Sequence, residues 1–137
     1  MKKGARAAIA LLCVAIFLLL ALGTLSLPIT HVGGTAQRAR HIAVTADIET
    51  INVQLRQYKA MNGFYPTTTQ GLQALVMEPA TEPRPRHWRQ LLKESPRDPW
   101  RNNFVYRCPG QKRPDTYDLF SAGADGVADS ADDDWGE

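Results

Sequence analysis

The sequence is poor in cysteine and, toward its end, in positive charge. It has two cysteines, Cys13 and Cys108, and no Lys or Arg after Arg113. Cys13 lies in an apolar segment that could span a membrane, and Cys108 lies in the outer part of the chain. The two thiols would be too far apart to bridge, so no intramolecular disulfide is expected. The basic stretch at residues 84–89 is short and interrupted by proline, which argues against a nucleic-acid site.

The chain also lacks the residue groupings of common active sites. Neither His31, His41 nor His87 has a Cys or an acidic residue arranged near it as a metal or triad partner. Ser121 lacks the flanking glycines of a nucleophile elbow. The sequence therefore predicts surface histidines, a Cys108 that either packs in the core or is an idle thiol, and no enzyme activity.

Charge is absent from a long apolar segment near the start of the chain. No residue from Ala7 to Leu27 is charged, and a helix of this length covers the roughly 30 Å hydrocarbon layer of a bilayer. The residues before it include three basic side chains and no acidic one: Lys2, Lys3 and Arg6. By the positive-inside rule, this end stays in the cytoplasm.

These features divide the chain into three parts. We expect a cytoplasmic basic leader at residues 1–6, a transmembrane helix at 7–27, and an outer domain at 28–137. A cleavable secretory signal is the alternative, since such peptides also begin with a basic and then an apolar stretch. The apolar segment is longer than a usual signal core, and Ser26-Leu27-Pro28 offers no small-x-small cleavage site.

The outer domain begins with an amphipathic pattern. Residues 35–61 predict a stalk helix that ends at Asn62-Gly63. Its apolar residues recur every three or four positions and form one narrow stripe: Val44, Ile48, Ile51, Leu55 and Tyr58. This stripe is expected to pack against a small core.

A smaller globular part follows, over residues 65–137. Thr67 and Gln70 have the spacing of a capping box, which predicts a short second helix to about Met77. Three prolines in residues 79–85 then exclude regular structure. The residue pattern predicts an antiparallel hairpin that pairs 104–106 with 117–120. The fold class is therefore α+β, with a long helix packed on a small antiparallel sheet.

The last part of the chain, residues 121–135, combines acidic residues with glycine. Calcium takes about six to eight oxygen ligands, and glycines allow a short loop to wrap around an ion. Asp125, Asp132 and Asp133 could meet in such a loop, although the spacing is not that of an EF-hand. A solvated acidic tail is the alternative. The flanking Phe120 and Trp135 favour a segment held against the core.

Four motifs together resemble the major pseudopilin, the G subunit, of bacterial type II secretion systems. They are Tyr65-Pro-Thr-Thr-Thr-Gln-Gly-Leu-Gln-Ala-Leu75, Asp98-Pro-Trp100, Tyr117-Asp-Leu-Phe-Ser-Ala-Gly-Ala-Asp-Gly126, and an Asp-rich stretch closed by Trp135. The resemblance implies a type IV pilin-like fold and a structural role. Such subunits pack with copies of themselves and other pseudopilins into a periplasmic pseudopilus, on an inner-membrane secretion platform, and assist export of folded proteins across the outer membrane.

The resemblance also implies a location and a metal site. The chain would be a single-pass protein of the bacterial inner membrane, with a cytoplasmic N-terminus and a periplasmic C-terminal domain. A structural Ca²⁺ would be bound by three carboxylates and three backbone carbonyls, which fall on Asp125, Asp132 and Asp133 and on Ala122, Val127 and Ser130.

The N-terminus departs from the family pattern. Members begin with a basic leader that ends in a Gly, after which prepilin peptidase cuts. A Phe follows the Gly, and a Glu lies four residues later in the apolar helix. In this chain Ala5 follows Gly4, and Ile9 takes the position of the Glu. A carboxylate in a membrane needs a partner, and in pilins it is thought to engage a neighbouring subunit. The alternative is thus a membrane-anchored module that binds or regulates an assembly without polymerising.

Overall fold

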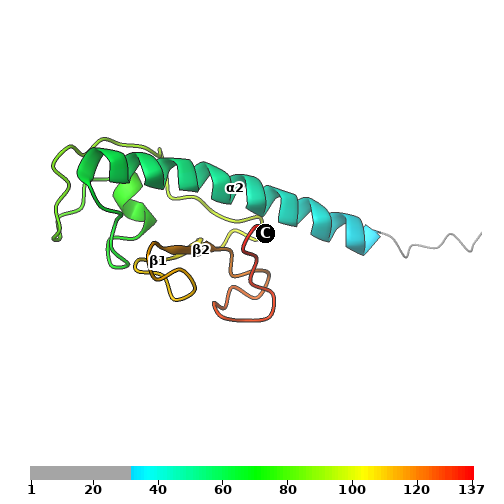
Figure 1. Cartoon of the computed structure of the whole chain (residues 1–137). Helices are drawn as coiled ribbons and strands as arrows, with labels where there is room; N and C mark the ends of the chain where they lie inside the picture. Colours follow the sequence, from blue (N-terminus) through cyan, green and yellow to red (C-terminus); the bar gives the residue numbers. More distant parts are fainter. Residues whose placement is uncertain (1–31) are drawn as a thin grey trace, which may run out of the picture. The chain divides into compact units, whose positions relative to one another are not determined.

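The computed structural model describes residues 32–137. The elements are helix α2 (Val32–Asn62), the 3₁₀ helix η1 (Leu72–Leu75), and strands β1 (Val105–Arg107) and β2 (Asp118–Phe120) (Figure 1). Two units divide the chain, Met1–Thr35 and Ala36–Glu137. The expected leader and transmembrane helix lie outside the described residues. Within residues 32–137, no helix combines the length and apolarity needed to cross a membrane.

Helix α2 provides one wall of the core, as its apolar stripe predicts. All five stripe residues are buried, and Val44, Leu55 and Tyr58 are fully so. The predicted end of the helix is also confirmed. Gly63 follows it with a φ of +87°, and its amide donates to the Lys59 carbonyl at 2.7 Å. Glycine adopts this left-handed conformation without the steric penalty of a Cβ.

The second helix differs from the prediction. The capping box forms, since the Thr67 amide donates to Gln70 Oε1 at 3.1 Å and the Gln70 amide to Thr67 Oγ1 at 3.2 Å. No α-helix follows it, only the single 3₁₀ turn of η1. Gly71, with a φ of 58°, separates the box from η1 and interrupts helical geometry.

The residues after η1 are irregular, as the prolines predict, yet they are fixed to it. The amides of Leu91 and Leu92 both donate to the Leu75 carbonyl at 2.9 Å. Trp88 Nε1 donates to the Ala74 carbonyl at 2.8 Å. Gln70 Nε2 bonds carbonyls within the proline-rich segment at 3.0 Å. The loop therefore covers one side of the core.

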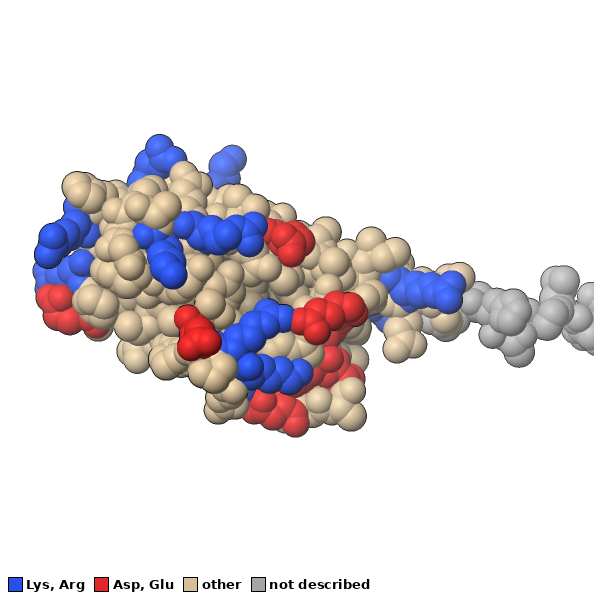
Figure 2. All heavy atoms as spheres, in the orientation of Figure 1, with Lys and Arg blue, Asp and Glu red and all other residues tan. Residues whose placement is uncertain are grey.

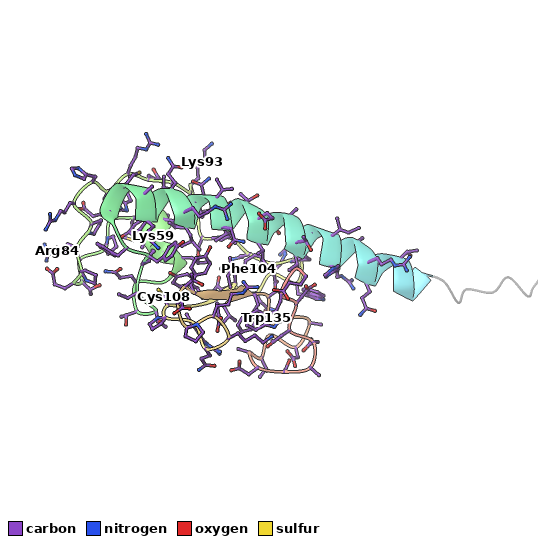
Figure 3. All side chains as sticks on the ribbon, in the orientation of Figure 1. Lys59, Arg84, Lys93, Phe104, Cys108 and Trp135 are labelled. Atoms are coloured by element: carbon purple, nitrogen blue, oxygen red, sulfur yellow. The ribbon has the colours of Figure 1, made fainter. Side chains whose placement is uncertain are left out.

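Strands β1 and β2 form the predicted antiparallel hairpin. The register pairs Val105 with Phe120 and Tyr106 with Leu119. All three residues of β2 are buried. A two-stranded hairpin is marginal on its own in water, so it depends on packing against α2. Phe104, which precedes β1, lies between the helix and the hairpin (Figure 3).

Replacing Tyr58 with Phe is expected to raise the free energy of unfolding by about 1 kcal/mol. The Tyr58 hydroxyl is buried and has no hydrogen-bond partner among the described residues. Tyr106→Phe is the matched control, because the Tyr106 hydroxyl donates to the Pro66 carbonyl at 2.7 Å. Removing that donor is expected to cost about 1 kcal/mol. Urea unfolding of both variants measures the difference, and equal effects would contradict the assignment.

Candidate functional site

Asp98 fixes the start of the acidic loop, residues 121–135. This carboxylate is 4% exposed. Its Oδ1 accepts bonds from the amides of Trp100 at 3.0 Å and Asn102 at 2.8 Å, and its Oδ2 accepts from the Ser121 hydroxyl at 2.5 Å. The Asp98-Pro-Trp100 motif is thus a turn whose buried carboxylate holds a residue 23 positions away.

The two ends of the loop are joined by backbone contacts. Ser121 and Asp134 exchange two amide-to-carbonyl bonds, each 2.9 Å. Asn102 Nδ2 donates to the Gly123 carbonyl at 2.8 Å. Gly123 has a φ of +65°, and a Cβ there would overlap both the carbonyl and the carboxylate of Asp132. Only glycine fits this close approach.

Four of the predicted site residues lie together. Asp132 Oδ2 accepts from the Asp125 amide at 3.2 Å, and its Oδ1 accepts from the Ser130 hydroxyl at 2.5 Å. Asp125 Oδ1 accepts from the Val127 amide at 2.8 Å. The Ser130 hydroxyl and then the Asp125 amide lower the pKa of Asp132, because both stabilise its charged form. This carboxylate is therefore held ionised.

Asp133 is not bonded to the other two carboxylates. Its Oδ2 accepts from the Asp129 amide at 2.9 Å, while its Oδ1 is buried and has no partner among the described residues. The carbonyl oxygens of Ala122, Val127 and Ser130 accept no hydrogen bond within residues 32–137. In the same range, no three His, Cys, Asp or Glu side chains are placed to hold a metal ion. The calcium site stays a prediction.

Partners for the acidic residues come from elsewhere in the chain, which the sequence analysis missed. Arg107 makes two bonds to Asp129, at 2.9 and 2.7 Å, across 22 positions. These bonds lower the pKa of Asp129 and raise that of Arg107. His41 Nδ1 contacts Asp134 Oδ2 at 2.9 Å across 93 positions. On the face in Figure 2, blue and red side chains accordingly lie against one another.

An aromatic stack holds the loop on the core. Trp135 stacks on Phe120 with ring centroids 4.2 Å apart, and Lys112 Nζ lies 3.6 Å from the Trp135 ring centroid. Figure 3 labels Trp135 below the hairpin. The expectation that flanking aromatic residues keep this segment against the core is confirmed.

One acidic residue near the loop serves the hairpin. Asp118 is fully buried and accepts bonds from the amides of Gln111, Lys112 and Arg113 at 2.6, 3.0 and 3.1 Å. Burial alone raises its pKa, but these amides outweigh burial and leave the pKa below the ordinary value. Asp118 therefore shapes the turn between β1 and β2.

The described residues that were considered for catalysis either lie at the surface or bond to and pack against neighbouring residues. His87 is exposed, and His41 is bonded to Asp134. The Ser121 hydroxyl donates to buried Asp98, and half-buried Cys108 packs against the core. His31 lies outside the described residues.

Comparison with known proteins places this architecture in one family. The family model described as Type II secretion system, protein G, matches residues 31–135. The type II secretion system core protein G of Pseudomonas aeruginosa is 40% identical over 111 residues, which cover 80% of this chain and 77% of the relative. The Klebsiella pneumoniae protein of the same name is 38% identical over 110 residues, covering 79% and 77%.

A solved structure agrees in fold. The crystal structure of the major pseudopilin from the type 2 secretion system of enterohaemorrhagic Escherichia coli matches with a TM-score of 0.70 and 37% identity, covering 79% of this chain and 95% of that one. The long helix, the small hairpin and the closing C-terminal loop are thus a pilin-like fold. The chain belongs to the protein G family of the type II secretion system and is a structural subunit of the pseudopilus.

Proposed function

We propose that the chain assembles with copies of itself and with other pseudopilins through the outer face of α2. Ile42 is 67% exposed and Val53 is 49% exposed. They are about three helical turns apart, so they lie on one face of α2, and both stand outside the buried stripe. Both side chains can pack against the helix of a neighbouring subunit. The main support for the proposal is the membership in the protein G family of the type II secretion system, and this face is where we place the contact.

We also propose that a Ca²⁺ ion fixes the C-terminal loop. Asp125, Asp132 and Asp133 would supply carboxylates, and Ala122, Val127 and Ser130 would supply carbonyls, which have no hydrogen-bond donors within residues 32–137. The best support is Asp133 Oδ1, a buried carboxylate oxygen without a partner in the described part of the chain. Buried charged oxygens are costly unless they are hydrogen-bonded or bind a cation.

The remaining parts of the proposal concern location and role. The uncharged segment from Ala7 to Leu27 would anchor the chain in the bacterial inner membrane, with the N-terminus cytoplasmic and residues 28–137 periplasmic. The subunit would meet the secretion platform there and assist export of folded proteins across the outer membrane. Its role would be structural and not catalytic, which agrees with the use of Ser121 and His41 in holding the acidic loop.

Cross-linking of the full chain in cells tests self-assembly. A ladder of homo-oligomers is expected, and it should weaken in Ile42→Glu and Val53→Glu, because a charge on this face opposes apolar packing. Met77→Glu is the matched control, since Met77 is 57% exposed but is part of neither α2 nor the acidic loop. A cross-link to one different protein, without a ladder, would instead favour the non-polymerising module. That alternative exists because Ile9 takes the position of the family's Glu.

A further inference from the structure

Arg107 joins the hairpin to the acidic loop, which lies beside it (Figure 1). Arg107 is the last residue of β1, and its Nη1 and Nη2 donate to the two carboxylate oxygens of Asp129 at 2.9 and 2.7 Å. Most ion pairs near the surface contribute little, but two parallel bonds from one guanidinium also fix direction. The Arg107 side chain is only 20% exposed, so the pair is partly shielded from water.

The guanidinium of Arg107 is also fixed on its own side. Its Nη1 donates to Gln111 Oε1 at 3.0 Å, and its Cζ lies 5.5 Å from the centroid of the Phe120 ring. A cation over an aromatic ring is attracted to it. Phe120 is fully buried, so it gives the guanidinium a support that belongs to the core. Arg107 therefore holds Asp129 from a well-packed part of the fold.

Asp129 has an unusual backbone conformation. Its φ is +67°, in the left-handed region that residues other than glycine rarely adopt. In this conformation its amide donates to Asp133 Oδ2 at 2.9 Å. Rare backbone conformations persist where the surrounding contacts determine them. The two bonds from Arg107 are contacts of this kind, since they fix the side chain of the same residue.

The bond to Asp133 connects this pair to the proposed calcium site. It occupies Asp133 Oδ2 and leaves Oδ1 buried, with no hydrogen-bond partner within residues 32–137. Oδ1 is the atom that best supports the calcium proposal. Asp129 also directly precedes Ser130 and comes two positions after Val127, which would both supply carbonyls. The backbone of Asp129 thus affects a carboxylate and two carbonyls of the proposed site.

We propose that Arg107 is a positioning residue for the calcium site, because it holds Asp129 and, through the Asp129 amide, orients the Asp133 carboxylate. The inference rests on the proposed calcium site and adds to it a residue that is not a ligand. Protein groups that orient metal ligands typically contribute about 10–100-fold to metal affinity. In this role the orienting effect of Arg107 exceeds the repulsion between its positive charge and a divalent cation.

Orientation and charge act in opposite directions, so one substitution separates them. Arg107→Gln removes both the paired bonds and the positive charge. As a positioning residue, Arg107 is expected to give a variant that binds Ca²⁺ about tenfold or more weakly. If the arginine acted only through its charge, or if the released Asp129 became a ligand, the variant would bind Ca²⁺ more tightly. Calorimetric titration of the full chain, purified in detergent, with CaCl₂ measures the affinity.

Two further variants and one control complete the titration. Asp129→Asn removes the acceptor of Arg107 but keeps a residue that tolerates a positive φ. Adding Arg107→Gln to Asp129→Asn should weaken binding no further, because both changes break one contact. Arg107→Lys keeps the charge without the paired bonds and should bind Ca²⁺ more weakly than the unaltered chain. Arg113→Gln is the matched control, since Arg113 bonds Glu137, outside the acidic loop; its affinity should change less than about twofold.

Hydrogen exchange without the ion reads the contact independently of Ca²⁺. In excess chelator, amides of residues 121–135 should exchange faster in Arg107→Gln and in Asp129→Asn than in the unaltered chain. A similar melting midpoint in chelator shows that the rest of the fold is kept. Unchanged exchange, or Ca²⁺ affinity in Arg107→Gln equal to or above that of the unaltered chain, would overturn the positioning role and leave the calcium proposal intact. If the unaltered chain bound no Ca²⁺, both would fail.

Discussion

Excess chelator is expected to lower the midpoint of thermal unfolding of the full chain by about 10 °C or more. An ion that binds only the folded state at 100 times its dissociation constant adds about 2.7 kcal/mol to the free energy of unfolding. In a domain of this size, each kcal/mol corresponds to roughly 4–8 °C. Without the ion, Asp133 Oδ1 would stay buried with no hydrogen-bond partner in the described part of the chain, which is costly for a carboxylate oxygen.

The control for this experiment is the double variant Asp125→Asn, Asp132→Asn. It removes two of the proposed ligands but keeps side chains of nearly the same shape. Its melting should not respond to chelator, and added Ca²⁺ should not raise its midpoint. Identical melting of the unaltered chain in calcium and in excess chelator would exclude a structural ion and favour a loop held only by Arg107, His41 and the aromatic stack.

Phe120→Ala is expected to cost about 3–5 kcal/mol of unfolding free energy. Phe120 is fully buried at the end of β2, and it is the residue on which Trp135 stacks. The substitution therefore opens a cavity and also removes the platform that holds the acidic loop. Chemical denaturation monitored by Trp fluorescence and by circular dichroism measures the loss.

A graded series keeps this prediction testable if the alanine variant folds poorly. Phe120→Leu retains most of the volume and should cost less than about 1.5 kcal/mol. Val127→Ala, at an exposed apolar position of the same loop, should stay within about 0.5 kcal/mol. Equal stability of the Phe120 and Val127 variants would contradict a central role for the stack.

The sequence predicts the elements whose signals are local. The spacing of Val44, Ile48, Ile51, Leu55 and Tyr58 identifies α2 and its buried side, and Asn62-Gly63 places its end within one residue. The hairpin is also correct to within one residue. These successes share one cause, since periodicity and turn residues act over a few positions.

The sequence was a poor guide in two places. One is the second helix, where a single glycine changes the backbone, and the other is the acidic loop, where the contacts come from residues far away in the chain. The capping box of Thr67 and Gln70 forms as predicted, but Gly71 prevents the α-helix that such a box usually begins. In the acidic loop, the sequence predicted a Ca²⁺ site, which stays a prediction, and did not predict the contacts made within the chain. Arg107 and His41 bond Asp129 and Asp134 from positions that no local pattern connects to the loop.

The turn at Asp98 has a consequence for any ligand of the acidic loop. Asp98 holds Ser121, Asn102 holds Gly123, and the paired backbones of Ser121 and Asp134 close the far side. These bonds are made by the protein alone, so they restrict the loop before an ion arrives. Pre-organisation of this kind lowers the entropic cost of binding and favours affinity. The motif Asp98-Pro-Trp100 would thus tune occupancy of a site to which it contributes no ligand.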